Sequence, residues 1–212
     1  MRAIVRAQRH RAPSAAALHY PGMRLFVGIP LAAAPIAELE ALARRLRPHS
    51  DFLRWVPPVS WHITLEFLGN ATPQQYEQLI THLAEVRHTP VFIQLTEPGC
   101  FERAGIFHTG VALTPQFATL HGLVATAVAR CSFTPETRPY HPHITLARAK
   151  GNGRAQALHA LHAQLAHTPA FTRFIAGEFL LYESRLSPTG AEYEVRARFP
   201  LAAQPAAPST CS

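Results

Sequence analysis

The sequence has very few of the residues on which several common chemistries depend. Among its 212 residues there is one aspartate, Asp51, and one lysine, Lys150. A single aspartate cannot supply the clustered hard carboxylates of an EF-hand or a two-metal nuclease. The lysine is followed by glycine rather than by serine or threonine, so it cannot belong to a P-loop. The composition therefore excludes Asp-rich metal sites and Walker-type nucleotide hydrolysis.

Cysteines and long apolar runs are scarce as well. The three cysteines, Cys100, Cys131 and Cys211, form no Cys-x-x-Cys pair, so neither a zinc ribbon nor a thioredoxin motif is present. An odd and sparse cysteine count is typical of a reducing compartment. No run of 18 apolar residues occurs, which argues against a membrane span. We therefore expect a cytoplasmic protein without disulfides and without a membrane partner.

Arginine and histidine are what the sequence has in excess. Lysine and arginine total 20 against 13 acidic residues, which gives a net charge of +7, and there are 13 histidines. Four of the arginines lie in residues 1–22, which contain no acid. We interpret residues 1–22 as a disordered extension or an over-long start, with an Arg-rich mitochondrial transit peptide as the alternative. The Ala- and Pro-rich residues 202–212 are interpreted as a disordered tail.

Between these ends, short apolar runs alternate with stretches of helical spacing. The apolar runs predict strands at residues 24–29, 62–68, 91–95, 106–113 and 142–146, and one or two more within 171–184. Helical spacing predicts helices at residues 35–47, from 73 onward, at 114–130 and at 154–167. A turn at residues 187–190 joins 179–184 to 192–199 as a terminal hairpin. No composition break marks a linker, so we predict one α+β domain, residues 23–201, built of two similar lobes.

The most informative feature is a repeated tetrapeptide. The sequence His-Ile-Thr-Leu stands at residues 62–65 and again at 143–146, in matching places of the two halves. Chance predicts roughly 0.005 copies of such a tetrapeptide in a chain of this composition. Side chains on a strand alternate between its two faces, so His62 and Thr64 share a face, and so do His143 and Thr145. Each strand therefore presents an imidazole beside a hydroxyl.

These groups suit phosphodiester chemistry. If an approximate two-fold axis relates the lobes, the two pairs face each other across a cleft. A neutral histidine can take a proton from water while a protonated one gives a proton to the leaving oxygen, and the threonines can donate to phosphate oxygens. Histidine suits both roles near neutral pH because its ordinary pKa is about 6.5. This chemistry requires neither a metal nor another cofactor, and we expect none.

Plainer interpretations exist for each of these residues. The two histidines can be ordinary core residues of strands, and the threonines can reflect strand propensity alone. His141 and His143 form a His-x-His pair of the kind that binds metals, but no third soft ligand is recognisable. The arginines near residue 45 can form a solvated helix face or attract RNA phosphates. The repeat in matched contexts favours the catalytic interpretation.

The motifs resemble those of the 2H phosphoesterase superfamily, and specifically the RNA 2′,3′-cyclic phosphodiesterases, also called 2′-5′ RNA ligases. Four blocks carry the resemblance, in order: MRLFVGIP at 23–30, RWVPP at 54–58 leading into HITLEFLG at 62–69, RPYHPHITLAR at 138–148, and residues 181–201. The resemblance implies a bilobal fold of two pseudo-symmetric lobes, each with an antiparallel-rich sheet and helices outside, around a central cleft. It also implies hydrolysis of RNA 2′,3′-cyclic phosphate ends to 2′-phosphomonoesters.

The resemblance also implies roles for individual residues. His62 is expected to protonate the departing 3′ oxygen and His143 to activate water, while Thr64 and Thr145 hold phosphate oxygens. Arg148 is a candidate phosphate contact, although strict alternation from His143 turns it away from the cleft unless the strand ends or twists there.

Two residues depart from the expected pattern. Glu66 should share the face of His62, where it either orients that histidine and raises its pKa or is a solvated rim residue. His108 stands where relatives are expected to carry a larger aromatic residue; if a base stacks there in the family, we expect His108 to weaken that contact.

The sequence leaves other activities open. The same chemistry can act on small cyclic nucleotides, an ADP-ribose cyclic phosphate or 2′-5′ linked oligonucleotides. A non-catalytic protein that binds RNA ends through the same cleft is a further alternative. We expect a monomer whose partner is RNA with a 2′,3′-cyclic phosphate end or a cyclic nucleotide.

Overall fold

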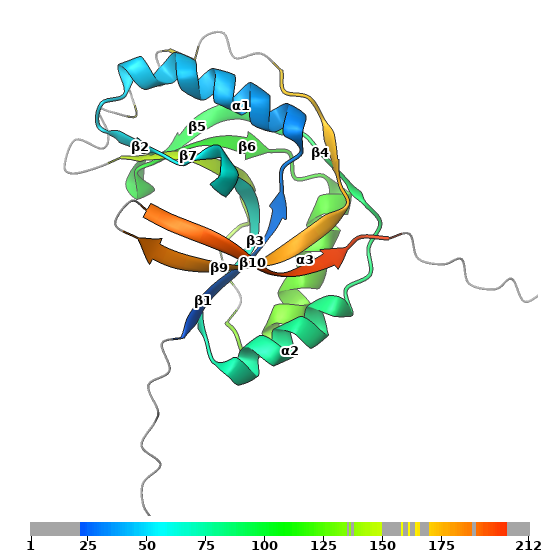
Figure 1. Ribbon diagram of the computed structural model, residues 1–212. Coiled ribbons are helices and arrows are strands. Elements are labelled where there is room, and N and C mark those ends of the chain that lie inside the picture. The colour runs from blue at the N-terminus through cyan, green and yellow to red at the C-terminus, as the bar shows by residue number, and fades with distance from the viewer. Residues whose placement is uncertain are drawn as a thin grey trace, which may run out of the picture.

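The computed structural model describes residues 22–134, 136, 138–149, 158, 161, 164–165, 170–187 and 190–202 (Figure 1). The expected extension and tail lie outside the described residues, apart from Gly22 and Ala202, and so does most of the helix expected at 154–167. Leu158 and Leu161 from that segment are described, and both are buried. No helix in the described part of the chain is both long and apolar enough to cross a membrane.

The chain forms two four-stranded antiparallel sheets, which we call sheet A and sheet B after their order along the chain. Sheet A has the strand order β10-β9-β1-β3 and contains β1 (Met23–Pro30), β3 (His62–Ala71), β9 (Glu178–Ser187) and β10 (Gly190–Pro200). Sheet B has the order β2-β7-β6-β5 and contains β2 (Leu53–Trp55), β5 (Leu95–Phe101), β6 (Ile106–Val111) and β7 (His143–Ala149). A small third sheet pairs β4 (Val91–Ile93) with β8 (Phe174–Ala176).

Three α-helices of the described residues lie outside the sheets (Figure 1). The helix α1 (Ala33–Leu46) follows β1 but lies over sheet B, whereas α2 (Pro73–Ala84) and α3 (Pro115–Ala129) pack together, and α3 contacts β3 of sheet A. Both α2 and α3 begin at a threonine followed by proline. Thr72 and Thr114 each accept a hydrogen bond from a backbone N–H of the first turn, which satisfies an otherwise unpaired donor.

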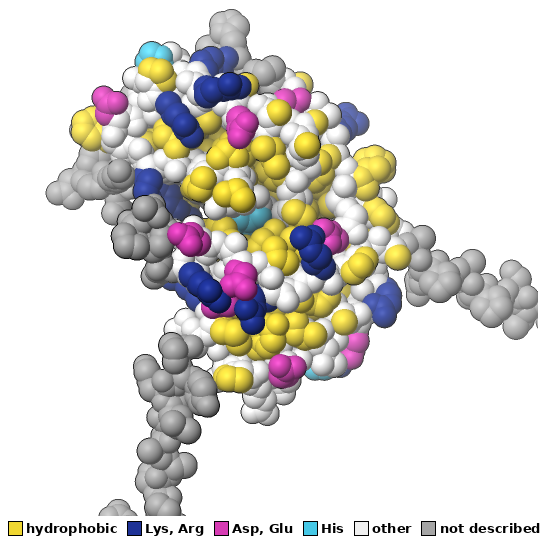
Figure 2. Space-filling model, viewed as in Figure 1, with side chains coloured by type: hydrophobic (Ala, Val, Ile, Leu, Met, Phe, Trp, Pro, Cys, Tyr) yellow, Lys and Arg dark blue, Asp and Glu magenta, His cyan; other side chains and the backbone are white. Residues whose placement is uncertain are grey.

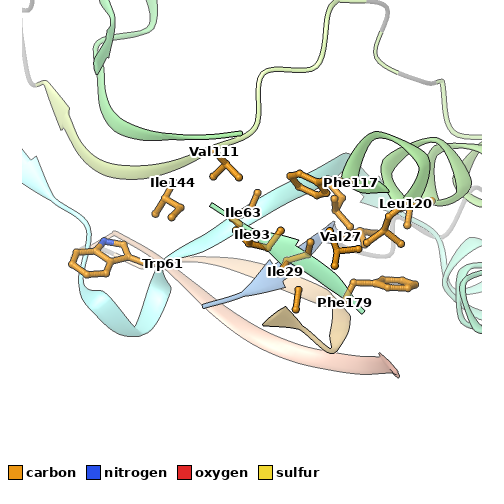
Figure 3. Close-up of a cluster of buried hydrophobic side chains, with 14 of the residues drawn as sticks. Val27, Ile29, Trp61, Ile63, Ile93, Val111, Phe117, Leu120, Ile144 and Phe179 are labelled. Carbon is orange, nitrogen blue, oxygen red and sulfur yellow. The ribbon is translucent and has the colours of Figure 1, made fainter. Parts of the chain in front are cut away.

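One continuous hydrophobic core joins the two sheets. Figure 3 shows Ile63 of β3 and Ile144 of β7 among its buried side chains, together with Val27 and Ile29 of β1. Ile63 and Ile144 are each 0% exposed. These are the residues that alternate with the histidines and threonines of the repeat, so their burial turns the polar members of both tetrapeptides away from the core.

The expected elements are largely confirmed. Both tetrapeptides begin strands, and the terminal hairpin is present as the paired β9 and β10. The strand expected at 91–95 is divided between β4 and β5, and the short β2 was not expected at all. The two sheets with helices outside them are the predicted bilobal α+β fold.

Candidate active site

The two histidines of the repeat are held in the same way. Nδ1 of His62 lies 2.8 Å from the carbonyl oxygen of Ser60, and Nδ1 of His143 lies 2.9 Å from that of His141. A carbonyl can only accept, so Nδ1 carries the hydrogen in both rings. Each histidine therefore bonds back to the residue two positions earlier and presents Nε2 as its free nitrogen, which is the atom available for proton transfer.

A β-bulge follows each tetrapeptide at the same place. In β3, Gly28 pairs with Thr64 and Val27 pairs with Glu66, which leaves Leu65 as the extra residue. In β7, His108 pairs with Thr145 and Phe107 pairs with Ala147, so Leu146 is extra in the matching position. A bulge reverses the alternation of side chains beyond it. In a regular strand the fourth residue after each histidine would share its face. Because of the bulge, the fifth residue lies on the histidine face and the fourth on the opposite one.

The bulge in β7 decides the orientation of Arg148. Leu146 and Ala147 are both buried, and Arg148 is exposed on the face that carries His143 and Thr145. The position of Arg148 agrees with its electrostatic effect, because its positive charge contributes to lowering the pKa of His62 and of His143. The regular alternation that would turn Arg148 away from the cleft does not hold, and the cause is this single unpaired residue.

The bulge in β3 overturns both expectations for Glu66. Its side chain does not share the face of His62 and is not a solvated rim residue, because Glu66 is 5% exposed. Oε1 of Glu66 lies 3.1 Å from Nε2 of His121 on α3. The position on the histidine face is taken instead by Phe67, which is 72% exposed and corresponds to Arg148 in the other lobe.

Tyr140 connects the two motif segments. Its hydroxyl donates a hydrogen bond of 2.8 Å to the carbonyl oxygen of Thr64, and its ring stacks on His121 at 3.7 Å. The adjacent residue, His141, provides the carbonyl that holds His143. One tyrosine therefore joins β3, α3 and the segment before β7, and the strands β3 and β7 are themselves in contact. Burial raises the pKa of Tyr140, so this hydroxyl keeps its proton and remains a donor.

Aromatic rings surround His62. The ring centroid of Phe26 lies 4.6 Å from that of His62, and Tyr193 meets the imidazole edge-on at 5.1 Å. Tyr182 stacks on Phe26 at 4.8 Å, and its ring centroid lies 5.7 Å from that of His62. Burial among these rings lowers the pKa of His62 to about 4, the bond to the Ser60 carbonyl opposes this shift, and the charges of His143 and Arg148 add to it.

His143 has a different environment. Phe101 meets its ring edge-on at 4.9 Å, and His108 lies 5.4 Å away while stacking on Phe101 at 4.1 Å. Burial lowers the pKa of His143, and it lowers that of His108 to about 4 with a further contribution from the charge of His143. Phe101 and His108 also line a hollow of about 390 Å³ beside the site.

The face of the molecule that Figure 2 shows is hollowed between its two halves. Figure 2 shows a histidine at the centre of this face, with apolar side chains around it and arginines and glutamates farther out. The strands β3 and β7 are in contact, and they bring His62 close enough to His143 and Arg148 for the charges of both to lower its pKa. The fold of two antiparallel sheets around this depression is that of the 2H phosphoesterases.

Comparison with known proteins identifies the family. A family model described as the 2′-5′ RNA ligase superfamily matches residues 30–186. The chain belongs to this family.

Curated relatives carry a common name. An RNA 2′,3′-cyclic phosphodiesterase of Geobacillus stearothermophilus is 32% identical over 189 residues, which cover 85% of this chain and 58% of that protein. The enzyme of the same name from Bacillus subtilis is 34% identical over 128 residues, which cover 58% of this chain and 69% of the relative. The match to the Geobacillus protein thus spans less than two thirds of its length.

Solved structures show the same fold. Escherichia coli LigT complexed with 3′-AMP superposes with a TM-score of 0.70 at 24% identity, over 85% of this chain and 98% of LigT. A protein of Thermus thermophilus superposes with a TM-score of 0.69 at 24% identity, over 84% of this chain and 98% of that protein.

Sequence reasoning missed the residues that surround and support the repeat. Tyr140 and His121 were not assigned a role, because their contacts with Thr64 and Glu66 join segments far apart in the chain. The bulge in β7 did leave a signal, since two consecutive apolar residues follow Thr145 and break the alternation. The bulge in β3 left none, because a glutamate occupies its buried position.

Proposed function

We propose that this protein is an RNA 2′,3′-cyclic phosphodiesterase that produces 2′-phosphomonoesters by general acid–base catalysis without a metal. The observation that carries the proposal is the matched presentation of His62 and His143, each with Nδ1 bonded to a backbone carbonyl and Nε2 free. The names of the curated relatives support the choice of substrate. The residues suit a cyclic phosphodiester, whose hydrolysis needs one proton acceptor, one proton donor and stabilisation of phosphate oxygens.

The reaction assigns one role to each histidine. Nε2 of His143 takes a proton from water as the water oxygen bonds to phosphorus. The bond between phosphorus and the 3′ oxygen breaks, and Nε2 of His62 gives its proton to that oxygen. The products are a 3′ hydroxyl and a 2′ phosphomonoester, so atoms and charge balance. The assignment of acid and base follows the resemblance to the family.

Three further groups stabilise the transition state. The hydroxyls of Thr64 and Thr145 donate to phosphate oxygens from the same faces as the histidines. The guanidinium of Arg148 offsets the charge that develops on those oxygens. Thr64 is also fixed through its own carbonyl by Tyr140, which limits how far the first pair can move.

Protonation of the acid is coupled to substrate binding. With a pKa of about 4, His62 is neutral at pH 7 in the free protein. An anionic phosphate beside the ring favours the charged form and raises this pKa. His62 therefore gains its proton as the phosphodiester binds, and the negative substrate itself creates the acid that the reaction needs.

The decisive experiment uses an oligoribonucleotide with a 2′,3′-cyclic phosphate end, incubated with the protein in EDTA. The expected product is the 2′ monophosphate, distinguished from the 3′ isomer by chromatography against standards. Binding without product on long incubation would instead indicate a non-catalytic RNA-end binder. If small cyclic nucleotides or 2′-5′ oligonucleotides are turned over faster than this oligoribonucleotide, they are the preferred substrates, and the proposed chemistry still holds.

We further propose that residues 23–201 form the whole catalytic unit and act as a monomer in the cytoplasm. The support is that both sheets, all residues of the candidate site and one continuous core lie within this range. Cys100 and Cys131 are free thiols, in keeping with a reducing compartment.

A further inference from the structure

Two arginines stand directly opposite each other at the edge of sheet B. In the antiparallel pair of β2 and β7, Arg54 pairs with Arg148, and both are exposed. Directly opposite residues of such a pair point to the same face, with Cβ atoms about 5 Å apart. Two positive side chains are therefore neighbours on one face of the sheet.

That face is the one that carries the candidate site. The next residue of β2, Trp55, points to the opposite side, where it meets the buried Phe107 edge-on at 5.8 Å and lies beneath the guanidinium of Arg47 at 5.9 Å. Arg54 must therefore point away from that packing. Its neighbour Arg148 lies on the face of His143 and Thr145, because of the bulge at Leu146.

Like charges placed directly opposite each other on a sheet are destabilising unless something compensates them. Within the described part of the chain, neither Arg54 nor Arg148 forms an ion pair with a carboxylate. The exposed arginines of the terminal hairpin show the contrast, since each of them pairs with a glutamate: Arg185 with Glu183 and Glu194, Arg196 with Glu183 and Glu194, and Arg198 with Glu178. The arginine pair of sheet B is thus arranged for an anion that the described residues do not supply.

The two arginines lie at different distances from the reacting centre. The charge of Arg148 acts on both histidines, whereas Arg54 is not among the causes of either pKa shift. Arg54 also stands on β2, one strand farther from His143 and at the sheet edge. An RNA strand that places its terminal cyclic phosphate between the histidines carries its next negative charge on the adjacent phosphodiester.

We propose that Arg54, beside Arg148, forms a second anion subsite that binds the phosphodiester on the 5′ side of the terminal nucleotide. Arginine is suited to this because its planar guanidinium binds phosphate through two hydrogen bonds. The proposal rests on the proposed function and extends it. It makes the protein selective for the ends of RNA chains over mononucleoside cyclic phosphates, which lack that phosphodiester.

The test compares two substrates with the full chain. One is adenosine 2′,3′-cyclic phosphate, and the other is the dinucleotide ApA ending in a 2′,3′-cyclic phosphate. Arg54→Gln is expected to lower kcat/KM for the dinucleotide about tenfold and to change that for the mononucleotide less than twofold. The slope of log kcat/KM against log salt for the dinucleotide should decrease in magnitude by about 0.7, the value for one lost contact to a single strand.

Two controls make the outcome specific. Arg47→Gln removes the same charge from the opposite face of β2 and should leave both substrates unaffected. A dinucleotide with a neutral methylphosphonate in place of the internal phosphodiester should be hydrolysed by the unaltered protein about tenfold more slowly than the natural dinucleotide, without any further loss in Arg54→Gln. The comparison of the natural and methylphosphonate dinucleotides on the unaltered protein needs no variant, so that part of the test also holds if a substitution disturbs folding.

Equal losses for both substrates, or no loss for either, would overturn the second subsite. If the unaltered protein hydrolyses neither substrate, the proposed function fails, and the subsite is then decided by binding. In that case the affinities of the unaltered protein and of Arg54→Gln for the natural and methylphosphonate dinucleotides are compared by titration. A difference confined to the natural dinucleotide supports the subsite, and the absence of one refutes it.

Discussion

The two lobes carry the same tetrapeptide in different surroundings. His62 lies among Phe26 and Tyr193, whose rings exclude water, while His143 lies beside Phe101 and a second imidazole. At the position five residues after each histidine, the first lobe has an exposed phenylalanine and the second has Arg148. Burial is the main cause that lowers the pKa of both histidines, and only the second lobe adds a positive charge at this position, which lowers both further. Identical motifs can thus take unlike roles because their neighbours differ.

Removing either imidazole should have the largest effect on activity. His62→Ala and His143→Ala should each reduce turnover of a cyclic phosphate by about 10²-fold or more, since each removes one partner of a general acid–base pair. Steady-state kinetics measure this loss. His49→Ala, an exposed histidine of the short helix before β2, should retain full activity. Full activity in either site variant contradicts the mechanism.

The pH dependence of activity should show how far the two environments shift the pKa values of the histidines. The acid is lost as the pH rises through its pKa, and the base is lost as the pH falls through its own. Since the pKa of His62 is lowered to about 4 and that of His143 is also lowered, kcat/KM should peak below pH 6.5, with limbs approaching about tenfold per pH unit. The maximum of kcat should lie at higher pH, because bound phosphate raises both pKa values.

These profiles are measured with a mononucleoside cyclic phosphate over about pH 4 to 9 at constant ionic strength. A kcat/KM maximum above about pH 7.5 would show that the surroundings of the histidines do not lower their pKa values in solution.

Removing the charge that only the second lobe supplies should have a smaller effect. Arg148→Gln is expected to lower kcat/KM about tenfold, through loss of a charged contact to phosphate. It should also move the kcat/KM profile to higher pH, since the positive charge of Arg148 lowers the pKa of both histidines. Arg44→Gln on α1 is the matched control. A loss of rate with an unmoved profile would place Arg148 outside the reach of the histidines.

The smallest expected effect tests the connection between the lobes. Tyr140→Phe keeps the ring stacked on His121 and removes the hydroxyl that donates to the Thr64 carbonyl. The free energy of unfolding should fall by about 1 kcal/mol, as for one partly buried hydrogen bond, and urea denaturation measures it. Tyr182→Phe is the control, because its hydroxyl has no hydrogen bond within the described residues. Equal effects of the two substitutions would show that the bridge contributes nothing.

The sequence predicted much of the fold because most of its signals are local. Apolar runs predicted strands, threonine–proline pairs marked the start of two helices, and the turn before β10 predicted the terminal hairpin. The faces of the two tetrapeptides followed from the two-residue period of a strand. Short β2 was missed, since a three-residue strand such as Leu53–Trp55 exists only through its pairing with β7.

The sequence predicted the faces of the two histidine–threonine pairs and missed the residues that support them. Glu66 and Arg148 were both placed by regular alternation, and in each case a bulge reversed the face. The expectation that His108 weakens a base-stacking contact stays a prediction; the structure shows its imidazole stacked on Phe101 beside His143.

The sequence by itself determined that each strand presents a histidine and a threonine on one face with two apolar residues on the other, because neighbouring residues of a strand always alternate. Only the tertiary structure decided where that alternation is interrupted, since a bulge depends on the register with a partner strand such as β1 or β6. It also decided the pKa of His62, since the rings that bury it come from β1 and β10, far away in the sequence.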